Sequence, residues 1–254
     1  MVIGAAAPVL PLPGVRAGVF LLPGPPPVLV DCGMRGQGGA IRRALQNAGV
    51  ATQDLALIAL THWHIDHTGG LRALRRHSRA IVAAHAADAP IIQGTTPPNK
   101  PRLTGEGGKF ARWLLIKLYQ PSKVDRLLAD DEIIPEAGGL KVVATPGHTA
   151  GHVCYYQPAA GILFAGDALV NRHGELAVSP EGFSDDPVQA RASLEALRPL
   201  RFDQCYFGHG EPLLARADQR VQDFLDRLAE EDRAEDDAAA GHGDEEAVPT
   251  EAVE

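Results

Sequence analysis

A hexapeptide at residues 62–67 carries four side chains that bind metal ions, namely His62, His64, Asp66 and His67. Side chains two positions apart in an extended segment point to the same side, so His62 and His64 can bind one ion. Asp66 and His67 follow after a bend and can reach a second ion beside the first. Four ligands within six positions would be a rare coincidence among unconnected surface residues. The hexapeptide therefore predicts a metal centre.

The sequence on either side of the hexapeptide predicts where this centre lies in the fold. Residues 55–61 form an apolar run of the kind that becomes a buried strand. Residues 68–77 favour a helix. The ligands would then occupy a loop at the carboxyl end of a strand, which is where α/β proteins place their binding sites.

Residues 61–70, Thr-His-Trp-His-Ile-Asp-His-Thr-Gly-Gly, resemble the signature of the metallo-β-lactamase superfamily. Four further segments resemble the opening strand and the later motifs of that family, in the family's order: residues 28–33, 145–152, 166–169 and 207–212. The later motifs place His148, Asp167 and His209 at ligand positions, and the opening strand places Asp31 behind the metal loop as a support. The likeness covers roughly residues 15–228.

The resemblance implies two metal ions and seven protein ligands. The first ion would be bound by His62, His64 and His148, and the second by Asp66, His67 and His209, with Asp167 shared between them. Nitrogen and oxygen ligands without cysteine suit Zn²⁺, here two per chain, although Fe²⁺ or Mn²⁺ would also fit. Asp66 is expected to orient the nucleophile as well, which makes it the candidate catalytic residue. His152 is expected to support the ligands without binding an ion.

The function implied by the resemblance is hydrolysis, as in members of the glyoxalase II and lactonase types. Metal binding lowers the pKa of water from about 15.7 to about 7, and the resulting hydroxide would attack an ester, thioester or lactone carbonyl. The sequence after His209 is too short and acidic for the glutathione-binding domain of glyoxalase II. Residues 168–171 lack the tyrosine that lactonases carry after the bridging aspartate.

Oxidation is the alternative function. Persulfide dioxygenases of the same fold bind one iron through two histidines and an aspartate, which would be His62, His148 and Asp167 in this chain. Residues 171–177 do not match the arginine-containing stretch of those enzymes. Hydrolysis is therefore favoured over oxidation.

Residues 93–126 form a basic, amphipathic insert between the first two metal motifs. Phe110, Trp113, Leu114 and Leu118 fall on one face of a helix. The segment can be a surface helix, a dimer contact, a membrane-facing helix or a lid over the metal site. In the lid interpretation, residues including Lys109, Arg112 and Trp113 would contact apolar and anionic parts of the substrate.

The order of strand-like and helical runs agrees with an α/β fold, and the resemblance specifies an αββα sandwich of two mixed β-sheets with helices on both outer faces. One domain is expected to span residues 1–228. From Glu230 onward there are eleven acidic residues and one basic residue, so residues 229–254 are expected to be an acidic, disordered tail.

Composition limits the location and partners of the chain. It has no run of 18 apolar residues that would predict a membrane span. Prolines interrupt its apolar N-terminus, which makes a poor secretion signal. Its three cysteines lack paired spacing, which suits a reducing compartment and predicts a cytoplasmic protein. We expect a small acyl, thioester or lactone substrate, anionic ones included, and no nucleic acid partner; the oligomeric state stays open.

Overall fold

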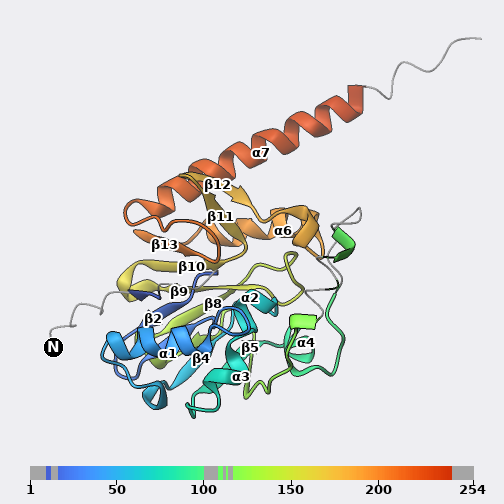
Figure 1. The fold of residues 1–254 in the computed structure, drawn as a ribbon. Helices are drawn as coiled ribbons and strands as arrows, with labels where there is room; N and C mark the ends of the chain where they lie inside the picture. Colours follow the sequence, from blue (N-terminus) through green and yellow to red (C-terminus); the bar gives the residue numbers. More distant parts are fainter. Residues whose placement is uncertain (1–9, 13–16, 100–107, 111–112, 114–116, 242–254) are drawn as a thin grey trace, which may run out of the picture.

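The computed structural model describes residues 10–12, 17–99, 108–110, 113 and 117–241, which form two β-sheets stacked face to face with helices outside them (Figure 1). The first sheet has the order β1-β2-β3-β4-β5-β6 and the second has the order β13-β10-β9-β8-β7. Strands β11 and β12 form a separate hairpin. This arrangement confirms the αββα sandwich expected from the resemblance.

The strands are short, and each sheet mixes parallel and antiparallel pairs. The strands of the first sheet are β1 (Leu10–Pro11), β2 (Phe20–Leu22), β3 (Val28–Val30), β4 (Leu57–Ala59), β5 (Ile81–His85) and β6 (Arg126–Leu128). Those of the second sheet and the hairpin are β7 (Ile133–Ile134), β8 (Leu140–Ala144), β9 (Val153–Gln157), β10 (Ile162–Gly166), β11 (Leu169–Arg172), β12 (Glu175–Val178) and β13 (Gln204–Phe207).

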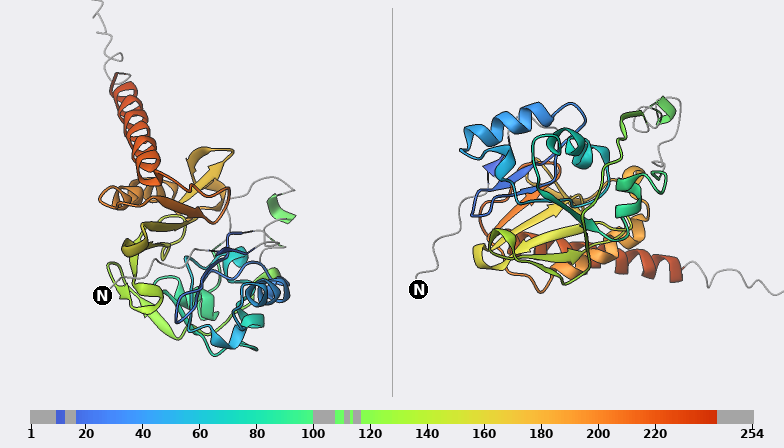
Figure 2. Two further views of the ribbon diagram at one scale, coloured as in Figure 1. Left: turned by 90° about the vertical axis from the view of Figure 1, so that its left-hand side faces the viewer. Right: turned by 90° about the horizontal axis from the view of Figure 1, so that it is seen from below.

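The helices cover the two outer faces of the sandwich (Figure 2). The α-helices are α1 (Gly38–Asn47), α2 (Ile65–Thr68), α3 (Leu71–Leu74), α4 (Ala89–Gln93), α6 (Pro187–Ser193) and α7 (Ala217–Gly241). The described residues also form the 3₁₀ turns η1 (Thr52–Asp54), η2 (Glu136–Gly138), η3 (Pro158–Ala160), η4 (Glu181–Phe183) and η5 (Leu194–Leu197). Helices α1 and α3 lie over the first sheet, and α7 lies over the second.

Alternating side chains along the strands fill three apolar layers. In β2, Phe20 and Leu22 face the second sheet, whereas Leu21 between them faces α1 and α3. This alternation is the two-residue period of a strand, and it buries both faces of the sheet. Among the described residues, no helix combines the length and the apolar character needed to cross a membrane.

Each metal motif begins where a strand ends. Strand β4 leads into His62, and the loops after β8, β10 and β13 carry His148, Asp167 and His209. These strands belong to both sheets, so the sandwich gathers ligands that are distant in sequence at one edge. The position predicted for the hexapeptide, a loop at the carboxyl end of a strand, is therefore shared by the other metal motifs.

Helix α7 is longer than the sequence analysis predicts. Disorder was expected from residue 229, whereas the helix continues to Gly241. Alanine, glutamate and arginine favour helices, and Arg191 of α6 forms ion pairs with Glu231 and Asp232 at 3.0 and 2.7 Å. The structure therefore continues the helix through residues 229–241, and the disordered tail stays a prediction for residues 242–254, which lie outside the described part of the chain.

Candidate metal centre

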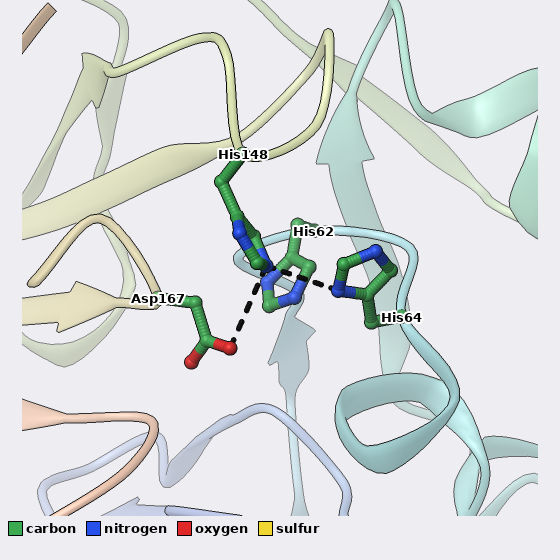
Figure 3. Close-up of side chains that lie close together, drawn as sticks. All are labelled: His62, His64, His148 and Asp167. Carbon is green, nitrogen blue, oxygen red and sulfur yellow. Dashed lines mark hydrogen bonds and ion pairs between the residues drawn. The ribbon is translucent and has the colours of Figure 1, made fainter. Parts of the chain in front are cut away.

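A group of four side chains, three of them buried and His64 partly buried, forms the first half of the centre (Figure 3). The ligand atoms of His62, His64, His148 and Asp167 all lie within 4.8 Å of one another. His148 Nε2 lies 3.0 Å from His64 Nδ1 and 3.5 Å from Asp167 Oδ2. Such convergence of three imidazoles and a carboxylate is the donor set of a transition-metal site.

A second group, formed by Asp66, His67 and His209, lies beside the first. His209 Nε2 is 3.1 Å from Asp66 Oδ2. The two groups meet at Asp167, whose Oδ1 lies 3.3 Å from His67 Nε2 and whose Oδ2 lies 3.4 Å from His209 Nε2. The structure thus brings all seven predicted ligands together, with Asp167 between the two groups.

Hydrogen bonds on the far side of the rings fix which nitrogen faces the centre. Thr61 Oγ1 donates its one hydrogen to Asp31 Oδ2 at 2.8 Å, so His62 Nδ1 must donate to Thr61 Oγ1 at 2.9 Å. Ser184 Oγ donates to the Pro180 carbonyl, so His148 Nδ1 donates to Ser184. Both arrangements leave Nε2 of the ligand histidine without a proton.

Unpartnered polar atoms also support a metal at this position. Nε2 of His62 is buried and has no hydrogen-bond partner among the described residues. His67 Nε2 and Asp167 Oδ1 are also buried and make no hydrogen bond, although they lie 3.3 Å apart as an ion pair. Buried polar atoms in native proteins are almost always bonded, so a cluster of such atoms requires a missing partner. A metal ion with its ligands oriented from behind satisfies all three atoms, and the residues present therefore fit the metal that the resemblance implies.

Asp31 lies behind the hexapeptide loop. Its carboxylate accepts hydrogen bonds from the Thr61 backbone N–H at 2.8 Å and from Thr61 Oγ1, and it pairs with His67 Nδ1 at 2.8 Å. Asp31 itself adopts a left-handed backbone with φ of 58°, a conformation that aspartate tolerates better than most residues. One carboxylate thus orients ligands of both groups.

His152 lies beneath Asp167. The Asp167 backbone N–H donates to His152 Nε2 at 3.0 Å, and His152 Nδ1 bonds Thr145 Oγ1 at 2.8 Å. Both ring nitrogens are therefore engaged, which leaves none for a metal ion. Gly166 is required beside this ring, because its φ is +52° and a Cβ would lie 2.7 Å from His152 Nε2.

Asp88 is a supporting residue that the sequence analysis missed. Its side chain is 1% exposed and accepts hydrogen bonds from Trp63 N–H at 2.9 Å, Thr149 Oγ1 at 2.7 Å and Gly151 N–H at 2.7 Å. It therefore joins the loop of His62 and His64 to the loop of His148. Burial raises the pKa of Asp88 to about 6, although these hydrogen bonds oppose the shift. Only its position three residues after a strand-like run could have drawn attention to it.

The two groups differ in electrostatics. Burial lowers the pKa of His64 to about 4 and the pKa values of His62 and His148 well below the ordinary range. In the second group, hydrogen bonds to Asp167 and then Asp66 raise the pKa of His209 to about 9. Burial opposes protonation of His67, but nearby carboxylates outweigh it and raise its pKa well above the usual value.

A cavity of about 850 Å³ is lined by ligands from both groups. The insert contributes Pro98, Asn99 and Tyr119 to its wall. Lys109 and Trp113 are exposed and do not line the cavity. Trp113 is 54% exposed and stacks on Phe110. Arg112 lies outside the described residues. The described helical residues of the insert stand at the edge of the sandwich (Figure 1), and the substrate contacts expected of Lys109, Arg112 and Trp113 stay a prediction.

Comparison with known protein families identifies the class of protein. The model of the metallo-beta-lactamase superfamily matches residues 19–209, a span that contains all seven ligands. The chain belongs to the metallo-beta-lactamase superfamily, and within it the chain is a metal-dependent hydrolase.

Individual relatives agree with this class. "Probable metallo-hydrolase YflN" of Bacillus subtilis (strain 168) is 30% identical over 208 residues, which cover 74% of this chain and 77% of that protein. The hydroxyacylglutathione hydrolase of Synechococcus sp. (strain JA-3-3Ab) is 34% identical over 149 residues, 58% of this chain and 46% of that protein. An atrochrysone carboxyl ACP thioesterase of Aspergillus fumigatus is 26% identical over 180 residues, 70% and 45% respectively. The chain thus matches less than half the length of the last two.

A solved structure extends the likeness in fold to almost the whole chain. The metallo-beta-lactamase with a HARLDQ motif from Cronobacter sakazakii superposes with a TM-score of 0.68 at 20% identity, covering 94% of this chain and 95% of that one. This similarity concerns the fold.

Proposed function

We propose that the chain is a binuclear zinc hydrolase that cleaves an ester, thioester or lactone carbonyl. One ion would be held by His62, His64 and His148 and the other by Asp66, His67 and His209, with Asp167 bound to both. The observation that carries this proposal is the position of Asp167 between the two groups. Its Oδ2 lies 3.5 Å from His148 Nε2 of the first group and 3.4 Å from His209 Nε2 of the second, and its Oδ1 lies 3.3 Å from His67 Nε2.

The side chains of the centre have distinct tasks in this reaction. When bound, the two zinc ions supply the acidity that provides hydroxide near neutral pH and the positive charge that polarises a carbonyl. Asp66 faces the cavity beside His209, and its carboxylate would orient the attacking oxygen. Its pKa is about 2 because His67 and His209 outweigh the effect of burial, so it stays ionised and can accept a hydrogen bond.

The relatives support carbonyl chemistry at a thioester. One of them is an ACP thioesterase, and another is a hydrolase of hydroxyacylglutathione. This chain matches less than half the length of each relative. Their names therefore do not identify the alcohol or thiol part of its own substrate. A thioester is nevertheless the first substrate class to examine.

The test is reconstitution. Protein stripped with a chelator would be supplied with Zn²⁺, Mn²⁺ or Fe²⁺ and assayed on thioesters, lactones and aryl esters. Zinc should restore hydrolysis, and Asp66→Asn should lower kcat more than it lowers zinc content. Oxygen consumption with a persulfide in the iron form, without hydrolysis in the zinc form, would instead support the one-iron dioxygenase. An Asp54→Asn variant, changed at an exposed position away from the cavity, is the matched control.

A further inference from the structure

The hairpin of β11 and β12 is fastened to the loop that carries His209. Asn171 donates its backbone N–H to the His209 carbonyl at 3.2 Å and its side-chain Nδ2 to the Glu211 carbonyl at 2.6 Å. Its Oδ1 accepts the Gly174 N–H at 3.0 Å, which closes the hairpin turn. Gly210 has a φ of +107°, and a Cβ there would lie 1.8 Å from the Asn171 carbonyl oxygen. The hairpin turn therefore has a fixed position relative to the second ligand group.

The last residue of β11, next to this turn, places a cation at the cavity. Arg172 lines the cavity and is exposed, and it is the only lysine or arginine among the described lining residues. No ion pair within 4.0 Å joins it to any described acidic group, unlike Arg75, Arg126, Arg191 and Arg198, which are paired. The carboxylates of Asp66 and Asp167 in the same cavity are directed toward the ligand histidines. Arg172 is thus available to a ligand.

The rest of the wall is largely apolar. Met34, Trp63, Ile65, Tyr119, Val170 and Phe183 line the cavity around the ligand groups. Cavities of roughly 300–1,000 Å³ enclose ligands of the size of a cofactor or drug, and the volume of about 850 Å³ falls in that range. A surface of this kind stabilises a substrate with an extended apolar part, because burying apolar area from water is favourable.

We propose that this cavity selects acyl substrates that carry a carboxylate at the far end of an apolar chain, with Arg172 binding that carboxylate. The inference rests on the proposed hydrolase function, which places the reacting carbonyl at the ligand groups. Because Asn171 fixes the backbone beside Arg172 against the His209 loop, the reach of the Arg172 side chain from the ligand groups is limited, and one chain length should fit best. Arginine presents paired N–H donors that match a carboxylate. Glu211 also lines the cavity and would repel the same anion.

The experiment uses matched thioesters of N-acetylcysteamine with acyl chains of four, six and eight carbons, each ending in a carboxylate or in the neutral carboxamide. Wild-type protein should prefer the carboxylate at one chain length. Arg172→Gln should raise KM for that carboxylate about tenfold, as expected for a hydrogen bond to a charged partner, and leave the carboxamide within about twofold. Glu211→Gln should increase the preference for the carboxylate over the carboxamide, because it removes a repelling charge. Arg42→Gln, on the exposed face of α1, should change neither.

A second measurement separates this inference from the proposed function. Thioether analogues, in which a methylene replaces the carbonyl, bind without reacting, and calorimetry gives their affinities. A carboxylate preference that disappears in Arg172→Gln supports the inference even if no thioester is hydrolysed. Equal affinities of the carboxylate and carboxamide analogues in the wild type would overturn the inference, and so would an equal loss of both affinities in Arg172→Gln. In either case, hydrolysis of the neutral thioester would still support the proposed hydrolase function.

Discussion

The two ligand groups share Asp167 but differ in their exposure to water. In the first group, His62 and His148 are each 1% exposed, and their pKa values are lowered because burial penalises the charged ring. In the second group, the side chain of His209 is 42% exposed and that of Asp66 is 27% exposed. Carboxylates there raise the pKa of His209 to about 9. The histidines of the first group are therefore neutral, whereas His67 and His209 of the second group are protonated beside carboxylates, with His67 itself buried.

This difference has a consequence for metal binding. An ion entering the first group meets histidines that carry no competing proton. An ion entering the second group must displace the protons of His67 and His209, because metal ligands bind in their deprotonated form. We therefore expect the first group to bind zinc more tightly and the second to exchange it more readily with solvent.

The largest effect is expected from Asp167→Ala, because this residue belongs to both groups. Its loss removes the shared ligand and leaves His67 and His209 without their common partner. Zinc content should fall below two ions per chain, and kcat/KM should fall by more than about 100-fold, the upper end for loss of a supporting residue. Elemental analysis and a thioester assay would measure both. Retention of two ions with near-normal activity would show that the groups are independent.

Asp88→Ala should weaken the first group selectively. It leaves the N–H groups of Trp63 and Gly151 without an acceptor, and the loops of His64 and His148 lose their link. Loss of a supporting partner costs about 10- to 100-fold in metal affinity. Competition with a chromophoric chelator would measure this, with circular dichroism to confirm folding.

Asp88→Glu is the conservative variant for the same position, because it keeps a carboxylate that can accept the same N–H groups. It should recover part of the zinc affinity that Asp88→Ala loses. If both variants instead bind zinc like the wild type, Asp88 contributes to the fold but does not position the ligands.

The pH dependence of zinc binding should separate the two groups. Because the pKa of His209 is raised to about 9, the metal-free second group holds a proton at pH 7 and releases it on binding zinc. Zinc affinity at this group should therefore increase as the pH rises toward 9 and decrease as the pH is lowered. Zinc affinity at the first group should vary little above pH 6. Calorimetry in buffers of different ionisation enthalpy would count the protons. Equal proton release at both binding events would contradict the distinction.

The smallest effect is expected far from both groups. Arg191→Ala removes the pairs to Glu231 and Asp232, whose side chains are more than half exposed, and exposed pairs contribute about 0–1 kcal/mol each. Hydrogen exchange should become faster in residues 229–241, while zinc content and activity stay unchanged. A change in zinc binding would mean that α7 influences the centre.

The sequence predicted most of the centre because its ligands lie in short motifs. Four of the seven fall within residues 62–67, and each of the others lies within four residues of the end of a strand. Asp31 was predicted through the resemblance, and the structure places its carboxylate against Thr61 and His67. The identity of the ligands could thus be inferred without knowing how the two sheets pack.

Other features depended on tertiary structure. Asp88 contacts Thr149 and Gly151, which lie 61 and 63 positions away in sequence, and no local pattern reports these contacts. The insert drew attention through its charge, yet the arginine that lines the cavity among the described residues is Arg172, at the end of β11. The predicted α7 was too short because the acidic composition of the C-terminal residues indicated a disordered, solvated segment. In the structure, Arg191 pairs with Asp232 and anchors the helix.

The most direct test of the account is the zinc content per chain before and after exposure to a mild chelator at neutral pH. Protein purified with zinc in the medium should contain two ions per chain and lose one from the second group first, leaving one held by His62, His64 and His148. The same protein carrying His209→Ala should start with one ion. A wild type that holds a single ion, or one iron in place of zinc, would contradict the two-group account.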